Sequence, residues 1–318
     1  MPVSNITIIA PLYNEAEVFA ELKQRLDAVI ASSSQNVQVL LIDDGSTDNT
    51  AMLMEEAITG NENYSCIFLS KNFGHGMALT AGLAELSNNT DAVFIIDGDL
   101  QDPPELLPQF INKMNEGYDV VYGIRNNRKE SFLKKAAYKL YYRLQEKISG
   151  SPMPLDAGDF SLISKRVVKQ MNRMPEQSRY VRGLRSWVGF KQTGIVYSRE
   201  ERHGGRSKYS LWQLIKLGFN GIFNFSELPI RFIGIVGLLS VLLSLVYLGV
   251  VVYDKLVHGT VPKGFTALIF AIVLFSGVQL LSLGLIGEYV LRIFFQVKQR
   301  PLFIIKSKIT KGKPADEE

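Results

Sequence analysis

The stretch Val-Phe-Ile-Ile-Asp-Gly-Asp-Leu-Gln-Asp-Pro-Pro, residues 93–104, is the most informative part of this 318-residue sequence. Four apolar residues run directly into two carboxylates, Asp97 and Asp99, which are separated by one glycine. A short apolar run without a polar residue predicts a strand that is covered on both faces. The carboxylates mark the end of this strand. The stretch therefore indicates an α/β domain with polar groups at the ends of its strands.

The same arrangement recurs through the first 125 residues, where strand-like apolar runs alternate with helical patterns. We predict strands at 6–10, 37–42, 66–69, 92–96 and 120–122, and helices at 15–31, 47–58, 75–86 and 104–115. Because the hydrophobicity of the strands is continuous, helices should cover both faces of their sheet. The sequence thus predicts a three-layer, Rossmann-like α/β domain with a mostly parallel sheet.

Polar motifs stand at the carboxyl ends of four predicted strands: Pro11–Glu15, Asp43–Ser46, Lys71–Gly76 and Asp97–Gln101. In sheets of this kind, ligands bind beyond the carboxyl ends of the strands. We therefore expect the four motifs to line one cleft.

Asp97 and Asp99 are candidate metal ligands. Two carboxylates at positions i and i+2, leaving a strand, can place oxygen atoms around one hard cation. Mg²⁺ and Mn²⁺ both favour such ligands, with phosphates and water completing the coordination sphere. The alternative is a solvated turn.

The other strand ends have two interpretations each. A carboxylate of Asp43–Asp44 could accept hydrogen bonds from a base or ribose, while Asp48 or Asn49 could cap the next helix. Tyr13 could stack on a base and Glu15 could bond a ribose hydroxyl, but each could equally serve a turn or a cap.

The sequence gives little support for a thiol or histidine site. Cys66 is the only cysteine, so an intramolecular disulfide is excluded, and its apolar surroundings predict a buried strand residue. His75 and His203 are single histidines in glycine-rich loops, and we do not expect them to be ligands.

Two long uncharged segments predict membrane spans. Residues 232–252 and 264–287 are 21 and 24 residues long, and about 20 apolar residues cross the hydrocarbon core. Residues 292–313 hold seven Lys or Arg, whereas the connector 253–263 holds two and an aspartate. The positive-inside rule then places the tail 292–318 and the domain 1–208 in the cytoplasm. We expect a multi-pass protein of the plasma (inner) membrane with a short extracytoplasmic loop.

Two further segments have the composition of interfacial helices. In residues 131–148, apolar and basic residues each recur every four positions, which is typical of a basic amphipathic helix on an anionic membrane surface. A solvated helix packed on its own domain is the alternative. Residues 209–229 are apolar with little charge and predict a second helix in the interface, just before the first span.

The motifs together resemble the family 2 glycosyltransferases of GT-A fold. The resemblance rests on Pro11–Glu15, Asp43–Ser46, Lys71–Gly74 and the run from Asp97 to Pro104, and extends over nearly the whole chain. The most similar branch contains the dolichyl-phosphate mannose synthases and the bacterial bactoprenol (undecaprenyl-phosphate) glucosyltransferases.

The resemblance implies roles for individual residues. The donor nucleotide would contact Pro11, Tyr13, Glu15, Asp43, Asp44, Asp97 and Gly98. The metal, Mg²⁺ or Mn²⁺, would be held by Asp97, Asp99 and Gln101. Phosphates would contact Arg125 and the basic loop residues Arg202, Arg206 and Lys208. Asp99, Arg125 and Asp159 would be the catalytic residues, with Asp159 orienting the acceptor or binding a sugar hydroxyl.

The implied activity is inverting transfer of a hexose, glucose from UDP-glucose, to undecaprenyl phosphate at the cytoplasmic membrane face. Mannose from GDP-mannose is the alternative donor. A processive polysaccharide synthase is disfavoured because Arg185-Ser186-Trp187 only faintly matches the Q-x-x-R-W motif. A non-catalytic scaffold or flippase subunit is disfavoured by the intact acidic motif. The implied partners are the nucleotide sugar, the lipid phosphate, the membrane and further copies in a homo-oligomer, a tetramer by analogy, but no nucleic acid.

Overall fold

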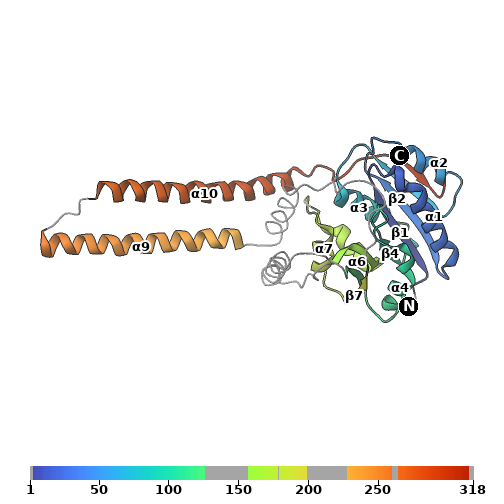
Figure 1. Ribbon diagram of the computed structural model, residues 1–318, viewed down its shortest axis with the longest axis horizontal. Coiled ribbons are helices and arrows are strands. Elements are labelled where there is room, and N and C mark those ends of the chain that lie inside the picture. Colours follow the sequence, from blue (N-terminus) through green and yellow to red (C-terminus); the bar gives the residue numbers. More distant parts are fainter. Residues whose placement is uncertain (1–2, 126–156, 178, 199–227, 260–263, 315–318) are drawn as a thin grey trace. The chain divides into compact units, whose positions relative to one another are not determined.

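The computed structural model describes residues 3–125, 157–177, 179–198, 228–259 and 264–314 (Figure 1). The chain divides into two compact units, one formed by residues 1–216 with 300–318 and the other by residues 217–299. The predicted helix 131–148, most of the predicted helix 209–229, and Arg202, Arg206 and Lys208 lie outside the described residues.

The first unit is built on a sheet of nine strands in the order β7-β5-β6-β4-β1-β2-β3-β8-β9. Their bounds are β1 Asn5–Leu12, β2 Asn36–Asp43, β3 Tyr64–Leu69, β4 Ala92–Ile95, β5 Val120–Arg125, β6 Ala157–Ser164, β7 Gln192–Tyr197, β8 Ile305–Thr310 and β9 Lys313–Pro314. The central strands β4, β1, β2 and β3 are parallel, as predicted. However, β6 lies antiparallel between β4 and β5, and β8 runs antiparallel to β3. The sheet is therefore mixed.

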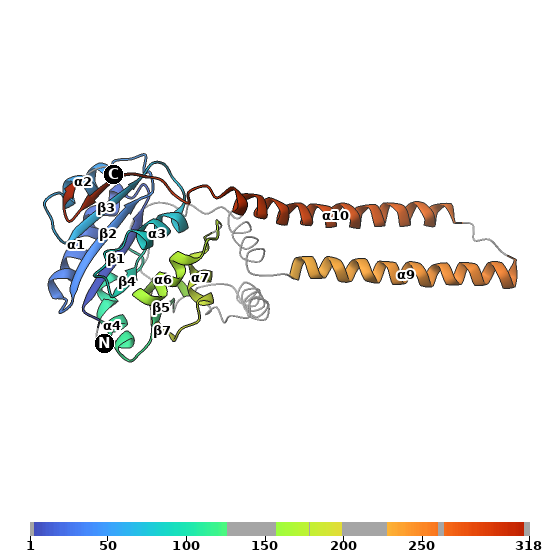
Figure 2. The ribbon, with the colours of Figure 1, turned by 180° about the vertical axis from the view of Figure 1, so that it is seen from behind.

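Helices cover both faces of this sheet, which confirms the three layers (Figure 2). They are α1 Ala16–Ser32, α2 Thr50–Ile58, α3 His75–Ala84, the short 3₁₀ helix η1 Pro104–Leu106, α4 Leu107–Asn115, α6 Lys165–Arg173 and α7 Val181–Trp187. Side chains of α1, α2 and α4 share one core with Ile6, Ile8 and other alternate residues of β1. On the opposite face α3 packs on β1 and β2, and α6 and α7 pack beside α3. Because β1 is apolar on both faces, it is buried between these two helical layers.

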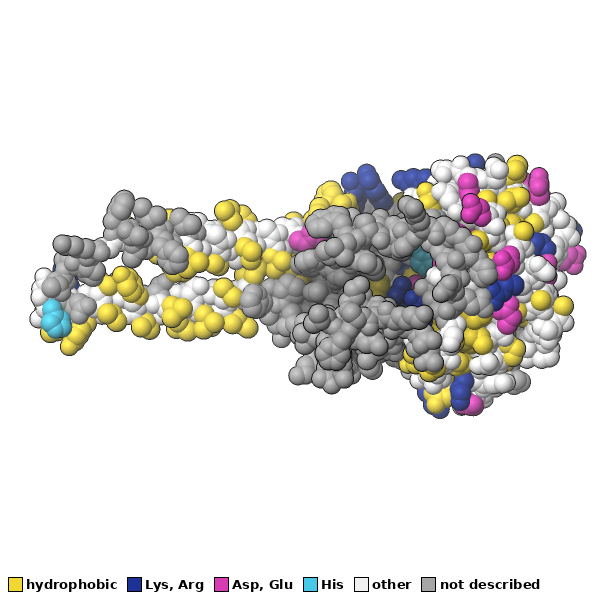
Figure 3. Space-filling model, viewed as in Figure 1, with side chains coloured by type: hydrophobic (Ala, Val, Ile, Leu, Met, Phe, Trp, Pro, Cys, Tyr) yellow, Lys and Arg dark blue, Asp and Glu magenta, His cyan; other side chains and the backbone are white. Residues whose placement is uncertain are grey.

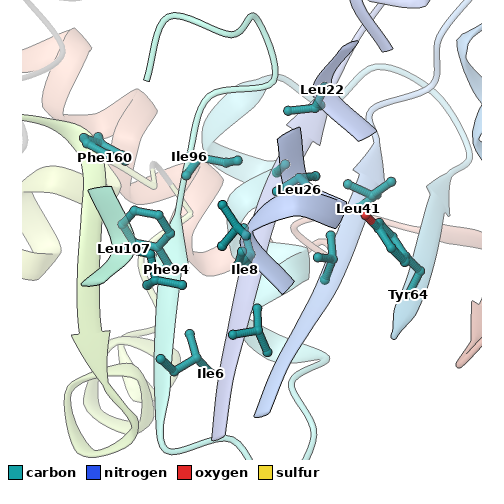
Figure 4. Close-up of a cluster of buried hydrophobic side chains, with 14 of the residues drawn as sticks. Ile6, Ile8, Leu22, Leu26, Leu41, Tyr64, Phe94, Ile96, Leu107 and Phe160 are labelled. Carbon is teal, nitrogen blue, oxygen red and sulfur yellow. The ribbon is translucent and has the colours of Figure 1, made fainter. Parts of the chain in front are cut away.

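An aromatic cluster joins the antiparallel part of the sheet to the parallel part. The ring centroids of Phe94 and Phe110 lie 5.1 Å apart, those of Phe110 and Phe160 4.9 Å, and those of Phe160 and Tyr197 5.0 Å. Figure 4 shows Phe94 of β4 and Phe160 of β6 beside the aliphatic residues of β1 and α4. Aromatic pairs of this kind contribute roughly 0.5–1.5 kcal/mol each beyond their burial. The cluster therefore fixes β6 and β7 relative to β4.

The second unit contains two long helices, α9 Leu228–His258 and α10 Phe265–Lys298. Both are long and apolar enough to cross a membrane, and exposed hydrophobic side chains line their described surface (Figure 3). The predicted spans 232–252 and 264–287 lie in these helices, which continue further at their ends. The predicted boundary at residue 292 falls inside α10.

The predicted basic tail 292–318 also contains β8, a strand of the nine-stranded sheet. Ile305 and Ile309 alternate with Lys306 and Lys308, and this two-residue period is typical of a half-buried edge strand. Ile309 is buried in the main core. The chain thus leaves the first unit for α9 and α10 and then returns to the same sheet.

Candidate active site

The predicted polar motifs lie at one edge of the sheet. Leu12 pairs with Asp43, and Ile9 pairs with Ile95, so the carboxyl ends of β1, β2 and β4 are aligned. Ile95 in turn pairs with Ser161 of the antiparallel β6. The amino end of β6, which carries Asp159, therefore lies beside the carboxyl end of β4, which leads into Asp97.

Asp44 connects three loops at this edge. Its amide donates a hydrogen bond to the Leu12 carbonyl at 2.9 Å. Its buried carboxylate accepts bonds from the Phe73 amide at 2.8 Å and the Gly74 amide at 2.9 Å. Burial raises the pKa of Asp44, although these two bonds oppose the shift. The carboxylate that we expected at the nucleoside therefore also fixes the loop 70–74.

Gly45 allows this arrangement because its loop lies against the next one. Its φ is +64°, and a Cβ atom there would lie 2.3 Å from the Lys71 carbonyl carbon and 2.6 Å from the Asn72 nitrogen. Both neighbours are backbone atoms and cannot rotate away. Only glycine fits this position.

The loop after β1 is fixed to the loop after β2. Asn14, with a φ of 53°, accepts a bond from the Thr47 amide at 2.8 Å through its side chain. The Glu15 amide donates to Thr50 Oγ1 at 2.9 Å. The Asp43 carboxylate accepts from the Ser46 amide. Of the residues predicted to contact the nucleotide, Pro11 is buried, while Tyr13 and Glu15 are half-buried at this edge.

The turn after β4 presents alternate residues to solvent. Asp97, Asp99 and Gln101 are half-buried, whereas the residues between them and Asp102 are buried. Gly98 is required by close packing, since a Cβ atom there would lie 2.5 Å from Leu12 Cδ2 and 2.7 Å from the Pro11 carbonyl oxygen. All three predicted metal ligands are thus partly accessible to solvent.

This set of atoms fits a hard divalent cation. Two carboxylates and an amide are oxygen donors of the class that Mg²⁺ and Mn²⁺ prefer. Among the described residues, no group of three or more His, Cys, Asp or Glu side chains could hold a metal by itself. A cation at Asp97, Asp99 and Gln101 would therefore need further oxygen ligands from a substrate or water.

His75, the first residue of α3, lies between two carboxylates of the site. Its Nε2 atom is 3.4 Å from Asp159 Oδ2 and 3.7 Å from Asp97 Oδ1. Burial acts to lower the pKa of His75, but Asp159 and Asp97 outweigh it and raise the pKa to about 9. We did not expect a site role for His75, because it is a single histidine in a glycine-rich loop of the sequence.

Asp159 is also bonded to Arg182 of α7, whose Nε donates to Asp159 Oδ2 at 3.2 Å. Burial alone would raise the pKa of Asp159, but Arg182 and His75 lower it well below its usual range. The carboxylate is therefore held ionised between two cationic side chains.

A second group surrounds Arg125 at the end of β5. Its Nε donates to the Tyr197 hydroxyl at 3.4 Å, and that hydroxyl donates to Asp102 Oδ1 at 2.5 Å. Gly158 leaves room for the guanidinium, since a Cβ atom there would lie 2.9 Å from an Arg125 terminal nitrogen. The predicted phosphate ligand Arg125 is thus held in place by buried groups.

Arg185 stabilises the position of α7. It is 2% exposed, it donates to the Gly158 carbonyl at 3.1 Å, and its guanidinium lies 5.6 Å from the centre of the Tyr122 ring. Burial lowers its pKa to about 10. Arg182 and Arg185 were not predicted as site residues; the available signal in the sequence was their spacing of three, which places both on one side of a helix.

Comparison with known proteins identifies relatives along nearly the whole chain. The sequence model of the family described as glycosyl transferase family 2 matches residues 7–171. An uncharacterized glycosyltransferase, YkcC of Bacillus subtilis (strain 168), is 41% identical over 301 residues, covering 94% of this chain and 93% of the relative. A bactoprenol glucosyl transferase derived from the SfII prophage of Shigella flexneri is 35% identical over 310 residues, covering 97% and 99%. The bactoprenol glucosyl transferase of Shigella phage SfV is 34% identical over 303 residues, covering 95% and 98%.

Proposed function

The chain belongs to glycosyl transferase family 2, and from that premise we propose that it transfers a hexose from a nucleotide-diphosphate sugar to a polyisoprenyl phosphate. The donor that we favour is UDP-glucose and the acceptor undecaprenyl phosphate. The observation that carries the proposal is the similarity to two bactoprenol glucosyl transferases over nearly the full length of each chain. The acidic turn 97–101 at the active edge of a GT-A-like mixed sheet supports it.

Asp97, Asp99 and Gln101 are the residues that would hold Mg²⁺ or Mn²⁺. When bound, the cation would neutralise the diphosphate that leaves with the nucleotide. Tyr13, Glu15 and Asp43 lie at the same edge and would contact the nucleoside, together with Pro11, Asp44 and Gly98.

The reaction needs alignment more than it needs a base. A lipid phosphate is already an anion at neutral pH, so its oxygen can attack the anomeric carbon directly, with inversion. Because the pKa of Asp159 is lowered by Arg182 and His75, its carboxylate is a weak base. Asp159 would therefore orient groups in the site, while Arg125 offsets the charge of the reacting phosphates.

Membrane attachment on the cytoplasmic side fits the path of the chain. β8 pairs with β3, so residues 305–310 must lie on the same side of a membrane as the soluble unit. Two spanning helices, α9 and α10, return the chain to the side from which it left. The excess of Lys and Arg in residues 292–313 favours the cytoplasm as that side of the inner membrane. Self-association, as a tetramer by analogy, belongs to the same proposal.

A donor panel tests this function. The full-length protein in detergent with Mg²⁺ would receive labelled UDP-glucose, UDP-galactose or GDP-mannose, with undecaprenyl phosphate or undecaprenol as acceptor. We expect labelled lipid from UDP-glucose only when the acceptor carries the phosphate. If labelled lipid forms only from GDP-mannose, the transferred sugar is mannose and not glucose. Absence of lipid-linked label with every donor, from folded protein, would contradict the proposal.

A further inference from the structure

We infer that Arg182 binds a phosphate group of a substrate and that Asp159 is the residue that positions it. This inference rests on the proposed function, and it assigns a site on the opposite side of Asp97 from Arg125. The ligand is a phosphate oxyanion, either of the nucleotide diphosphate or of the lipid phosphate.

Arg182 is held in a way that leaves its terminal amino groups available to a ligand. Among the residues that the structure describes, its one hydrogen bond runs from Nε to Asp159 Oδ2 at 3.2 Å, and the Asp159 side chain is 8% exposed. The Arg182 side chain is 34% exposed, and its two terminal amino groups donate no hydrogen bond to any residue that the structure describes. A guanidinium fixed through Nε presents these two groups as a planar fork, which matches two oxygens of one phosphate.

Arg125 is attached in a similar way. Its Nε is also engaged, by the Tyr197 hydroxyl, and its terminal amino groups likewise bond to no described side chain. The two arginines adjoin consecutive residues of β6, Arg125 beside Gly158 and Arg182 on Asp159. Because consecutive residues of a strand point to opposite faces, the two guanidiniums reach the edge of the sheet from its two sides.

Side-chain packing supports this assignment to opposite faces. Phe160, which points to the same face as Gly158, belongs to the core beneath α4. Asp159 faces the other layer, where it contacts His75 of α3 and Arg182 of α7. Both arginines interact electrostatically with Asp97, which follows the carboxyl end of β4. A phosphate bound near the acidic turn would therefore have a guanidinium on each side.

Charge supports the same assignment. The proposed divalent cation would offset Asp97 and Asp99, whereas Asp159 is a further carboxylate that would repel a phosphate. The guanidinium attached to Asp159 offsets this charge at the place where it acts. Arg185 is buried beneath and bonded to the Gly158 carbonyl, so α7 cannot shift without breaking that bond. The fork is therefore pre-positioned.

The variants Arg182→Met, Arg182→Lys and Asp159→Asn test the inference against Lys169→Met, which removes a cation from the exposed surface of α6. Two readouts are needed, both with the full-length protein in detergent. One is the affinity for UDP, with GDP as the second probe, measured by calorimetry with Mg²⁺ and without acceptor. The other is the KM for undecaprenyl phosphate and for the donor in the transfer assay. Thermal unfolding identifies variants that retain their fold.

If the diphosphate is the ligand, Arg182→Met weakens nucleoside diphosphate binding by about 10- to 100-fold, the loss typical of one charged hydrogen-bonding partner. If the lipid phosphate is the ligand, nucleotide affinity is retained and the KM for undecaprenyl phosphate rises by a similar factor. In either case Arg182→Lys recovers part of the loss because the charge remains. Asp159→Asn shows a smaller loss in whichever of the two readouts Arg182→Met changes. A purely structural role of Asp159 would not confine the loss to that one readout.

The inference is overturned if folded Arg182→Met and Arg182→Lys match Lys169→Met in both readouts. If Arg182→Met does not fold, Arg182→Lys and Asp159→Asn are compared with Lys169→Met in the same two readouts. The inference is then overturned if both variants match this control. Failure of the proposed function is distinguishable, because nucleoside diphosphate binding is measured without transfer. Wild type that binds UDP but transfers no sugar to lipid would remove the function and leave the diphosphate test of Arg182 intact.

Discussion

Asp44→Asn tests how far the active edge depends on one buried carboxylate. The two oxygens accept amide bonds of 2.8 Å from Phe73 and 2.9 Å from Gly74, and the residue is 3% exposed. An asparagine side chain keeps one oxygen that can accept a bond from one of these two amides. Its amino group then faces the other amide, and two donors cannot form a hydrogen bond. The change loses one charge-assisted bond, about 1.5–3 kcal/mol, and leaves buried donors unpaired, about 1–3 kcal/mol more.

Part of this loss is recovered because the substitution removes a buried charge. Burial raises the pKa of Asp44, so the ionised carboxylate carries a desolvation cost that asparagine does not have. We expect a net loss of about 2–3 kcal/mol, which lowers the Tm of a unit of this size by about 4–12 °C. The loop 70–74 leads directly into His75, so we also expect transfer to fall by at least about tenfold through misplacement of the site.

Asp91→Asn is the matched control. Its carboxylate also accepts two backbone amide bonds, from Ser4 at 3.3 Å and Asn5 at 2.9 Å, but it is exposed at the opposite end of the strands. Water can replace these bonds, so the loss should stay below about 1 kcal/mol and transfer should be unchanged. Thermal unfolding and the transfer assay on both variants give the comparison. Equal Tm and equal activity for the two variants would refute the assigned role of Asp44.

Three further changes test other parts of the account. Gly45→Ala should lower the Tm clearly more than Gly117→Ala, because both have positive φ but only the Cβ at Gly45 meets backbone; equal shifts would contradict this. Tyr197→Phe should lower kcat by about tenfold because it releases Arg125, and it should also lower the Tm because the buried Asp102 carboxylate loses its hydroxyl donor; an unchanged kcat in the folded variant would separate the Arg125 contact from catalysis. Removal of residues 305–318 should lower the Tm and promote aggregation by exposing the edge of β3, whereas removal of 315–318 should not.

The sequence predicted the parallel core of the fold because that part obeys a simple rule. β1 to β4 are almost entirely buried, so apolar residues dominate both of their faces, and the polar residues that follow these strands mark the candidate site. The acidic turn was predictable for the same reason, since Asp97 and Asp99 follow such a run directly.

The antiparallel part was harder to predict because its strands carry buried polar groups. In β6, Asp159 and Ser161 face the layer of α3 and α7, where a histidine and arginines compensate the carboxylate. The sequence of β6 therefore mixes polar and apolar residues and lacks the apolar run that predicts a buried strand. In β8, Lys306 and Lys308 obscured an alternating pattern inside a segment dominated by its positive charge.

The partners of Asp159 could not be read from the sequence. His75 lies 84 residues before it and Arg182 lies 23 residues after it, and neither interval matches a local motif. Only the placement of β6 beside β4, with α3 and α7 on one face, brings the three together. The acidic motif was thus predictable from the local sequence, whereas the cationic side of the candidate site depends on tertiary structure.

The most direct test of the central claim is the amount of sugar that wild type and Asp99→Ala transfer to undecaprenyl phosphate. Folded full-length protein in detergent, with Mg²⁺ and labelled UDP-glucose, would be assayed for label that extracts into organic solvent. If Asp99 holds the cation as we propose, its loss should lower the rate by about 100-fold or more, while the Tm stays within a few degrees of wild type. Equal rates of lipid-linked product from the two proteins would contradict the account.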